Sequence, residues 1–314
     1  MSRVAIAGGT GGVGRTIVEE LVRQGKQDVV VLSRKSNSLK GLESVPVFAV
    51  DYNDVTSTAA TLRDLRIETI ISTLSLFTEE VGEAQLKLIQ AAIESKSVKR
   101  FAPSEFAFNY LRPGLRDFHD AAQMRIDAAN MLRNSQLQFT RFVFGWILDT
   151  WNPSRAKTNL PPMTWVVDFE HRQARIPGDG MDPFTVLHSH DIAKYIAELL
   201  DDGRPWPEMS AFAGDRLSFN DMVEMAENIT GKKFEVSFEP VVNLEKKDVV
   251  VLDQPEGSYD FGEGLREVTA EFGLMVVKGM MDVKADGLRN EEYPSVKPIK
   301  VKTWMQQIWG SQAC

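Results

Sequence analysis

Five glycines fall within seven positions of the stretch Gly8-Gly-Thr-Gly-Gly-Val-Gly14. The stretch can be aligned as Gly-x-Gly-x-x-Gly from residue 9 or as Gly-x-x-Gly-x-x-Gly from residue 8. Either spacing permits a tight turn, a close approach of the backbone to a diphosphate, and tight packing of a helix on a strand. The N–H groups that open the following helix would face the phosphates. We therefore expect a dinucleotide to be bound by Gly8, Thr10, Gly11, Gly12, Val13 and Gly14.

The second strand of the predicted sheet ends at Ser33-Arg34-Lys35-Ser36, without a carboxylate. A site specific for NAD places Asp or Glu about 20 residues beyond the last glycine, where it bonds the ribose 2′-hydroxyl. A guanidinium, an ammonium group and two hydroxyls instead suit a 2′-phosphate, which Arg34 can bind through two hydrogen bonds. The pattern favours NADP(H), with Arg34 and Lys35 as cofactor-binding residues. The alternative interpretation is a solvated turn with two ordinary basic residues.

The elements that would position these residues alternate through the first half of the chain. The apolar runs of strand length are Val4–Ala7, Val29–Leu32, Val47–Val50, Thr69–Thr73, Arg100–Ala102 and Phe139–Phe144. The helical patterns between them are Val13–Arg23, Thr56–Leu65, Val81–Glu94 and Ala121–Asn134. This alternation is typical of βαβ units and predicts an α/β protein with a Rossmann-type, doubly wound parallel sheet.

After about residue 150 the pattern changes. Turn-forming segments rich in proline and glycine separate irregular stretches, for example Leu160-Pro-Pro162 and Pro177-Gly-Asp-Gly180. Helices are expected again at Asp191–Leu200, Ser218–Thr230 and Leu265–Phe272. We predict an NADP-binding domain over residues 1–150. Residues 151–314 are expected to form a smaller C-terminal α/β substrate domain, interleaved with the first, over the carboxyl ends of the strands.

Composition excludes several classes of function. The 314 residues carry a formal net charge of −8, so no basic field favours nucleic acid or anionic lipid. No apolar run approaches the roughly 20 residues of a membrane helix. The one cysteine is Cys314, which rules out a disulfide within the chain and argues against a thiolate metal site. The opening MSRVAIAGG leads directly into a strand, so we expect no signal peptide and a cytoplasmic location.

Four segments together resemble the isoflavone reductase-like, NmrA-like branch of the atypical short-chain dehydrogenases. They are the glycine loop, the strand end Val31-Leu-Ser-Arg34, Arg100-Phe-Ala-Pro-Ser-Glu-Phe106, and Thr230-Gly-Lys232 after a helix. The resemblance spans most of the chain. It implies NADPH-dependent reduction of aromatic secondary metabolites, or regulation by a bound nucleotide without turnover. It also implies that residues Thr10 to Val13 contact the diphosphate, Arg34 the 2′-phosphate, and residues Pro103 to Phe106 the nicotinamide.

The chain departs from this family at one position. The family's reductases use a lysine fifteen residues before a threonine on the next strand, and the residue at that distance from Thr140 is Arg125. No lysine occurs between Lys99 and Lys157, so a shifted register does not restore it. Arginine stays protonated and is a poor proton donor, although it can stabilise a developing oxyanion.

A reduction therefore needs a proton from another group. His119, six residues before Arg125, is a candidate because histidine titrates near neutrality. Asp120 lies beside it. The alternative is that Arg125 pairs with a surface carboxylate and that His119 is solvated. Ser104 and Glu105 are further catalytic candidates, although Glu105 could instead fix a loop.

Aromatic residues gather where a substrate pocket would open, beyond the strand that ends near residue 144. We expect Phe106, Phe144, Trp146 and Trp151 to line an apolar pocket for a small hydrophobic ligand, with Phe108 and Tyr110 in the same region. The oligomeric state is left open. The expected functions are an NADPH-dependent oxidoreductase acting on an aromatic or polycyclic secondary metabolite, a non-redox isomerase that keeps NADP(H) bound, and an NADP-sensing NmrA-like regulator.

Two further motifs are interpreted as coincidences. Tyr293-Pro-Ser-Val-Lys297 has the Tyr-x-x-x-Lys spacing of typical short-chain dehydrogenases, but Pro294 and Pro298 argue against the helix that this pair needs. His188-Ser-His190-Asp191 resembles a metal cluster, yet Asp191 is a natural N-cap for the helix that follows. We expect no metal site.

Overall fold

The computed structural model describes residues 2–117, 119, 122–151, 156–284 and 287–310. The chain divides into two compact units, and the first contains Met1–Val143 and Ile192–Ala211. The second contains Phe144–Asp191 and Phe212–Cys314. The first unit changes to the second between Val143 and Phe144, whereas we expected a boundary after residue 150. Residues 192–211 return to the first unit, so the two units are interleaved along the chain.

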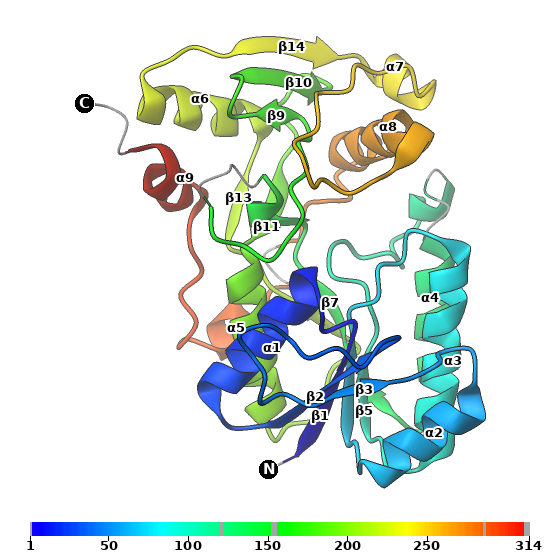
Figure 1. Ribbon diagram of the computed structural model, residues 1–314. Coiled ribbons are helices and arrows are strands. Elements are labelled where there is room, and N and C mark those ends of the chain that lie inside the picture. Colours follow the sequence, from blue (N-terminus) through cyan, green and yellow to red (C-terminus); the bar gives the residue numbers. More distant parts are fainter. Residues whose placement is uncertain (1, 118, 120–121, 152–155, 285–286, 311–314) are drawn as a thin grey trace. The chain divides into compact units, whose positions relative to one another are not determined.

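The first unit contains a six-stranded parallel sheet in the order β3-β2-β1-β4-β5-β6 (Figure 1). Its strands are β1 (Arg3–Ala7), β2 (Asp28–Ser33), β3 (Val47–Ala49), β4 (Thr69–Ser72), β5 (Arg100–Ala102) and β6 (Gln138–Phe139). The order reverses between β1 and β4, as in Rossmann-type folds, whose ligands bind beyond the carboxyl ends of the strands at that reversal. The predicted fold class is confirmed.

Helices cover both faces of this sheet, which is why its central strands are continuous apolar runs. Figure 1 shows α1 and α5 on one face and α2, α3 and α4 on the other. Their bounds are α1 (Gly12–Gln24), α2 (Val55–Asp64), α3 (Glu79–Ser95), α4 (Ala122–Arg133) and α5 (Ser189–Asp201), the last belonging to this unit from Ile192 onward. The core between the sheet and α2, α3 and α4 includes Leu32, Ile70 and Phe101.

The predicted strand Phe139–Phe144 was wrong as a single element. β6 pairs with β5, whereas β7 (Arg141–Val143) pairs with β12 (Met209–Ala211) in a separate parallel ladder. Thr140 lies between them, buried, and its hydroxyl shares a hydrogen bond of 2.8 Å with that of Ser210. The strand divides because the chain changes its hydrogen-bonding partner at Thr140, an effect that periodicity does not reveal.

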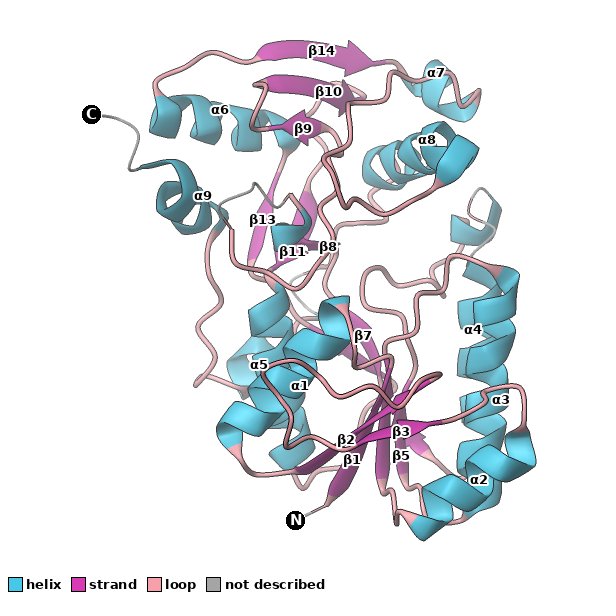
Figure 2. Ribbon diagram, in the orientation of Figure 1, coloured by secondary structure: helices cyan, strands magenta, loops and turns pink. Residues whose placement is uncertain are grey.

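The second unit is built from two small mixed sheets and four helices among its described residues; Figure 2 separates its strands from its helices by colour. One sheet has the order β14-β10-β9 and the other β13-β11-β8. The strands are β8 (Trp146–Ile147), β9 (Val167–Asp168), β10 (Gln173–Pro177), β11 (Phe184–Leu187), β13 (Asp215–Leu217) and β14 (Glu235–Glu239). The helices are α6 (Phe219–Thr230), α7 (Val241–Glu245), α8 (Leu265–Val277) and α9 (Val301–Trp309).

All seven predicted helices are present, with ends that differ by up to five residues. The predicted N-cap at Asp191 was wrong, because α5 begins at Ser189 and Asp191 lies in its first turn. The Asp191 carboxylate instead accepts a hydrogen bond of 2.8 Å from the N–H of Ile299. Within the described ranges, no helix combines the length and the apolar character that crossing a bilayer requires.

Candidate functional site

The glycine loop leaves the carboxyl end of β1 and turns into α1. Gly8 has φ +83°, in the left-handed region that favours glycine. A Cβ at Gly14 would lie 2.4 Å from Oγ1 of Thr73 and 2.5 Å from O of Gly8. Thr73 follows β4, and its hydroxyl donates to O of Ala7 at 2.8 Å. Gly8 and Gly14 are therefore required for the close approach of β1, β4 and α1.

Gly11 differs from these two glycines. A Cβ there would meet no protein atom within 4 Å, and the φ of Gly11 is −151°, which any residue can adopt. Neither packing nor backbone conformation explains a glycine at this position. Gly11 is also the N-cap of α1, which has no side-chain cap and no acidic residue in its first turn. The first N–H groups of α1 thus have no side-chain cap, and such groups can bind an anion.

Beside the loop, a cavity of about 620 Å³ opens at the carboxyl end of β2. It is lined by Thr10, Arg15, Ser33, Arg34, Lys35, Asn37, Ser38, Leu39 and Lys40. Four of these side chains are cations and none is a carboxylate. The structure thus brings the predicted residues Thr10, Arg34 and Lys35 together around one concave, positively charged surface.

Sequence reasoning missed two of the four cations, Arg15 and Lys40. Arg15 donates from Nε to the Glu19 carboxylate at 2.9 Å, and from Nη2 to O of Lys40 at 2.6 Å. It therefore ties the first turn of α1 to the loop that follows β2. In the sequence, Arg15 is recognisable only as a basic residue early in the first predicted helix. The residue that it contacts, Lys40, lies 25 positions further along the chain, so the sequence does not reveal that the two lie together.

The segment after β5 is held by hydrogen bonds to neighbouring elements of the first unit. The N–H of Ser104 donates to Oε1 of Gln85 at 2.7 Å, and its hydroxyl donates to O of Leu74 at 2.8 Å. Pro103 is buried beside it. Phe106 is also buried, has φ +22°, and stacks on Phe142 with ring centroids 5.7 Å apart. The predicted residues Pro103 to Phe106 therefore form a fixed loop at the carboxyl edge of the sheet.

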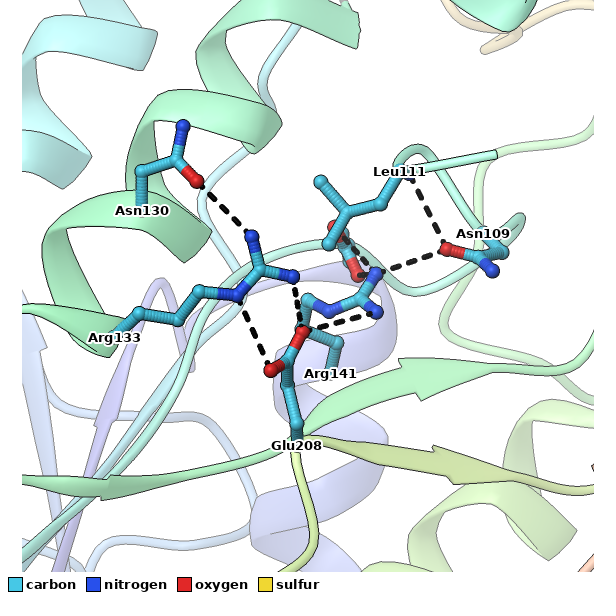
Figure 3. Close-up of polar contacts among 7 residues, drawn as sticks. Asn109, Leu111, Asn130, Arg133, Arg141 and Glu208 are labelled. Atoms are coloured by element: carbon cyan, nitrogen blue, oxygen red, sulfur yellow. Dashed lines mark hydrogen bonds and ion pairs between the residues drawn. The ribbon is translucent and has the colours of Figure 1, made fainter. Parts of the chain in front are cut away.

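Glu105 lies in a buried ion pair that the sequence did not predict. Nη1 of Arg141 is 3.2 Å from Oε2 of Glu105 and 3.1 Å from Oδ1 of Asn109. Figure 3 shows that the Arg141 guanidinium also forms an ion pair with the carboxylate of Glu208, which in turn pairs with Arg133. Burial raises the pKa of Glu105 to about 7, and the nearby guanidinium of Arg141 only partly opposes this. The pair anchors the loop after β5 to β7.

Arg125 and His119 both lie against Tyr110. Arg125 is buried on α4, with its Cζ atom 4.3 Å from the centroid of the Tyr110 ring. Its Nη2 donates to O of Leu76 at 3.5 Å. His119, also buried, stacks on the same ring at 5.8 Å with an interplanar angle of 27°. Both side chains are buried, so His119 is not solvated, whereas Asp120 lies outside the described residues.

The predicted substrate-binding residues are divided between the two units. Phe106 belongs to the first, whereas Phe144, Trp146 and Trp151 belong to the second. Trp146 and Trp151 are buried together with Trp165, and the indole N–H of Trp151 donates to O of Trp165 at 2.7 Å. Within their own units, these side chains pack mainly as core.

The two motifs that we interpreted as coincidences are His188-Ser-His190-Asp191 and Tyr293-Pro-Ser-Val-Lys297. Among the described residues, no three His, Cys, Asp or Glu side chains are arranged to hold a metal ion. In the other motif, Tyr293 follows a short 3₁₀ turn and is buried, with the Arg289 guanidinium 5.5 Å from its ring. No helix carries Tyr293 and Lys297 on one face.

The glycine loop, the parallel sheet and the segment after β5 correspond to a known family. A family model described as the NmrA-like family matches residues 1–297. The chain belongs to the NmrA-like family. An oxidoreductase named swnN from Metarhizium robertsii is 30% identical, and the match covers 98% of this chain and 97% of that protein. An oxidoreductase named BOA1 from Botryotinia fuckeliana is 34% identical over 74% of this chain and 78% of its own length.

Solved structures of plant reductases share the fold of this NmrA-like chain. A ternary complex of leucoanthocyanidin reductase from Vitis vinifera has a TM-score of 0.75 at 20% identity, and 98% of this chain and 99% of that chain are covered. An isoflavone reductase has a TM-score of 0.74 at 18% identity, with the same coverage. The predicted resemblance is confirmed: its homologues are oxidoreductases, including reductases of the isoflavone reductase type.

Proposed function

We propose that this NmrA-like chain is an NADPH-dependent oxidoreductase that reduces a hydrophobic aromatic or polycyclic secondary metabolite. The observation that carries the proposal is the cavity of about 620 Å³ beside the glycine loop, with Arg34, Lys35 and two further cations on its wall. A phosphate bound by several cations and facing no carboxylate is electrostatically favoured. An adenosine ribose with a 2′-phosphate suits this cavity better than one with a free 2′-hydroxyl.

The residues present fit the rest of the cofactor. The open space beside Gly11 and the N–H groups that begin α1 suit the diphosphate, and the nicotinamide would then lie toward the carboxyl edge of the sheet. When bound, NADPH supplies a hydride. Pro103 and the fixed loop after it provide a wall for the ring, and Ser104 holds this loop through its bond to Leu74.

Arg125 would supply positive charge for the substrate. Its guanidinium is buried on α4, near the loops that follow β4 and β5. There it would stabilise negative charge that develops on a substrate oxygen as hydride arrives at carbon. Glu105 would act indirectly, because its carboxylate is already bound by Arg141.

The substrate class is supported by the relatives. A solved neighbour of the same fold holds NADP+ and (+)-pinoresinol, with a TM-score of 0.73 at 21% identity and 98% of each chain covered. We propose that this chain also takes a small, mainly apolar ligand with aromatic rings. Phe106, in the first unit, is the candidate for contact with it.

The test is a panel of aromatic and polycyclic carbonyl, enone and benzylic ether compounds, incubated with the purified chain and NADPH. Loss of the near-ultraviolet absorbance of the reduced nicotinamide, with formation of a reduced product, is expected for at least one compound. Product without any change in that absorbance would instead establish the isomerase. Specific binding of NADP(H) and of a protein partner, with no product from any compound, would establish the regulator.

A further inference from the structure

A carbonyl reduction leaves one requirement that Arg125 cannot meet. The oxygen of the substrate must gain a proton when its carbon gains a hydride, and a guanidinium does not release a proton at working pH. Ser104 is also poorly suited, because its hydroxyl already donates to O of Leu74. A donor has to be sought among the other groups that lie close to Arg125.

Tyr110 is a titratable side chain that lies directly against Arg125. The centroid of its ring lies 4.3 Å from Cζ of Arg125. The side chain is 4% exposed, so the guanidinium acts on the ring with little screening by water. Its hydroxyl forms no hydrogen bond within the described part of the chain, and it is not among the polar atoms sealed from solvent there. The phenol can therefore meet a ligand.

The electrostatic surroundings of Tyr110 suit a proton donor. Burial raises the pKa of its phenol, so the proton is retained at neutral pH, while the charge of Arg125 opposes this rise and that of Glu105 adds to it. A phenolate formed by proton loss would lie directly beneath the guanidinium. His119 stacks on the same ring, with the ring centroids 5.8 Å apart.

We propose that Tyr110 is the proton donor of the reduction, and that Arg125 stabilises the phenolate that remains. The proposal rests on the proposed reductase function. In the step, a hydride from the reduced nicotinamide forms a C–H bond at the carbonyl carbon, and the C=O π electrons take the phenol proton to form O–H. NADPH is oxidised to NADP+, the carbonyl is reduced to an alcohol, and water returns a proton to Tyr110.

The first experiment compares Tyr110→Phe with the wild-type chain on a carbonyl compound that the panel shows to be reduced. The variant removes only the hydroxyl and keeps the ring beneath Arg125. We expect kcat to fall by about 100-fold or more, the usual range for loss of a general acid. NADPH affinity, measured by fluorescence titration, and the thermal unfolding midpoint should stay unchanged. A kcat within twofold of the wild type would overturn the proposal.

Tyr293→Phe is the matched control. Tyr293 is also a buried tyrosine with an arginine against its ring, Arg289 at 5.5 Å, but it lies in the second unit. Its loss should leave kcat unchanged. A drop equal to that of Tyr110→Phe would show that the effect is a general response to loss of a buried hydroxyl, and the assignment would fail.

A second readout does not depend on turnover. The chain has five tyrosines, so subtracting the alkaline absorbance titration of Tyr110→Phe from that of the wild type isolates Tyr110. Repeating the subtraction in an Arg125→Gln background should move the ionisation of Tyr110 to higher pH. An unmoved ionisation would contradict the role given to Arg125. If no compound is reduced by the wild type, the reductase function fails first; an active wild type with an equally active Tyr110→Phe fails this proposal alone.

Discussion

The guanidinium of Arg141 lies 3.2 Å from the carboxylate of Glu105, with side-chain exposures of only 4% and 1%. The two residues are 36 positions apart, and together they join β7 to the loop after β5. Arg141 also reaches Asn109 on the same loop, and its other side faces Glu208. The pair therefore fixes the segment in which Ser104, Phe106 and Tyr110 are held.

Replacing Arg141 with Ala should lower the free energy of unfolding strongly. It leaves the Glu105 carboxylate buried without its main partner, and breaking buried pairs in this way costs about 3–5 kcal/mol. Arg133→Ala is the matched control, because its pair with Glu208 is exposed and such pairs contribute less than about 1 kcal/mol. Urea unfolding followed by circular dichroism measures both. If the two variants lost equal amounts of unfolding free energy, burial of the ion pair would not explain the loss in Arg141→Ala.

The same carboxylate should make stability depend on pH. The pKa of Glu105 is raised from 4.5 to about 7 in the folded chain, so between these values the folded state binds more protons than the unfolded state. Its contribution to the free energy of unfolding therefore falls as pH rises through this window, by up to about 1.4 kcal/mol per pH unit. In Glu105→Gln, which cannot titrate at this position, this fall in the free energy of unfolding between pH 4.5 and about 7 should be absent. Parallel pH profiles for the two chains would refute the expectation.

Two glycines of the loop should respond differently to the same added methyl group. Gly14→Ala places Cβ against Thr73 and the Gly8 carbonyl, so we expect a loss of about 1–3 kcal/mol in stability. Gly11→Ala meets no protein atom and should leave the unfolding midpoint unchanged, while weakening NADPH binding by about tenfold or more. Thermal unfolding and calorimetric titration separate the two effects. Unimpaired NADPH binding by Gly11→Ala would exclude a diphosphate at this position.

Arg34→Asp should weaken NADPH binding much more than NADH binding. A charge-assisted hydrogen bond contributes about 1.5–3 kcal/mol, which corresponds to a loss of roughly 10- to 100-fold in affinity for the phosphorylated cofactor. Lys87→Asp makes the same change of charge on α3, at a residue that does not line the cavity, and should affect neither cofactor. Fluorescence titration with both nucleotides is the measurement. An equal loss for NADPH and NADH would remove Arg34 from the 2′-phosphate site.

Arg125→Ala should lower turnover by about 100- to 1000-fold, the range seen when one group that stabilises an oxyanion is removed. NADPH affinity should remain nearly intact, because Arg125 does not line the cavity beside the glycine loop. Arg125→Lys keeps the positive charge at this position, so it should recover part of the activity. Turnover that is unchanged in Arg125→Ala would exclude the residue from the reaction.

The sequence alone predicts those parts of the site that are local in the chain. The glycine loop, Arg34 and the segment from Pro103 to Phe106 each stand at the end of a recognisable apolar run. The partners that hold these parts could not be predicted in the same way. Arg141 finds Glu105 across 36 residues, because the chain changes its pairing partner at Thr140. Neither the charges nor the apolar periodicity of the sequence indicates that the chain changes its strand pairing partner at Thr140.

The ladder of β7 and β12 has a consequence for the synthesis of the chain. The first unit is not finished at residue 143, because residues 192–211 contribute β12 and most of α5. On the ribosome, the edge of β7 stays open until β12 (Met209–Ala211) has been added and has emerged, several seconds at ordinary rates of elongation. An exposed strand edge invites wrong pairing. Folding of this protein should therefore depend on elongation speed and on chaperones that shield β7 until β12 arrives.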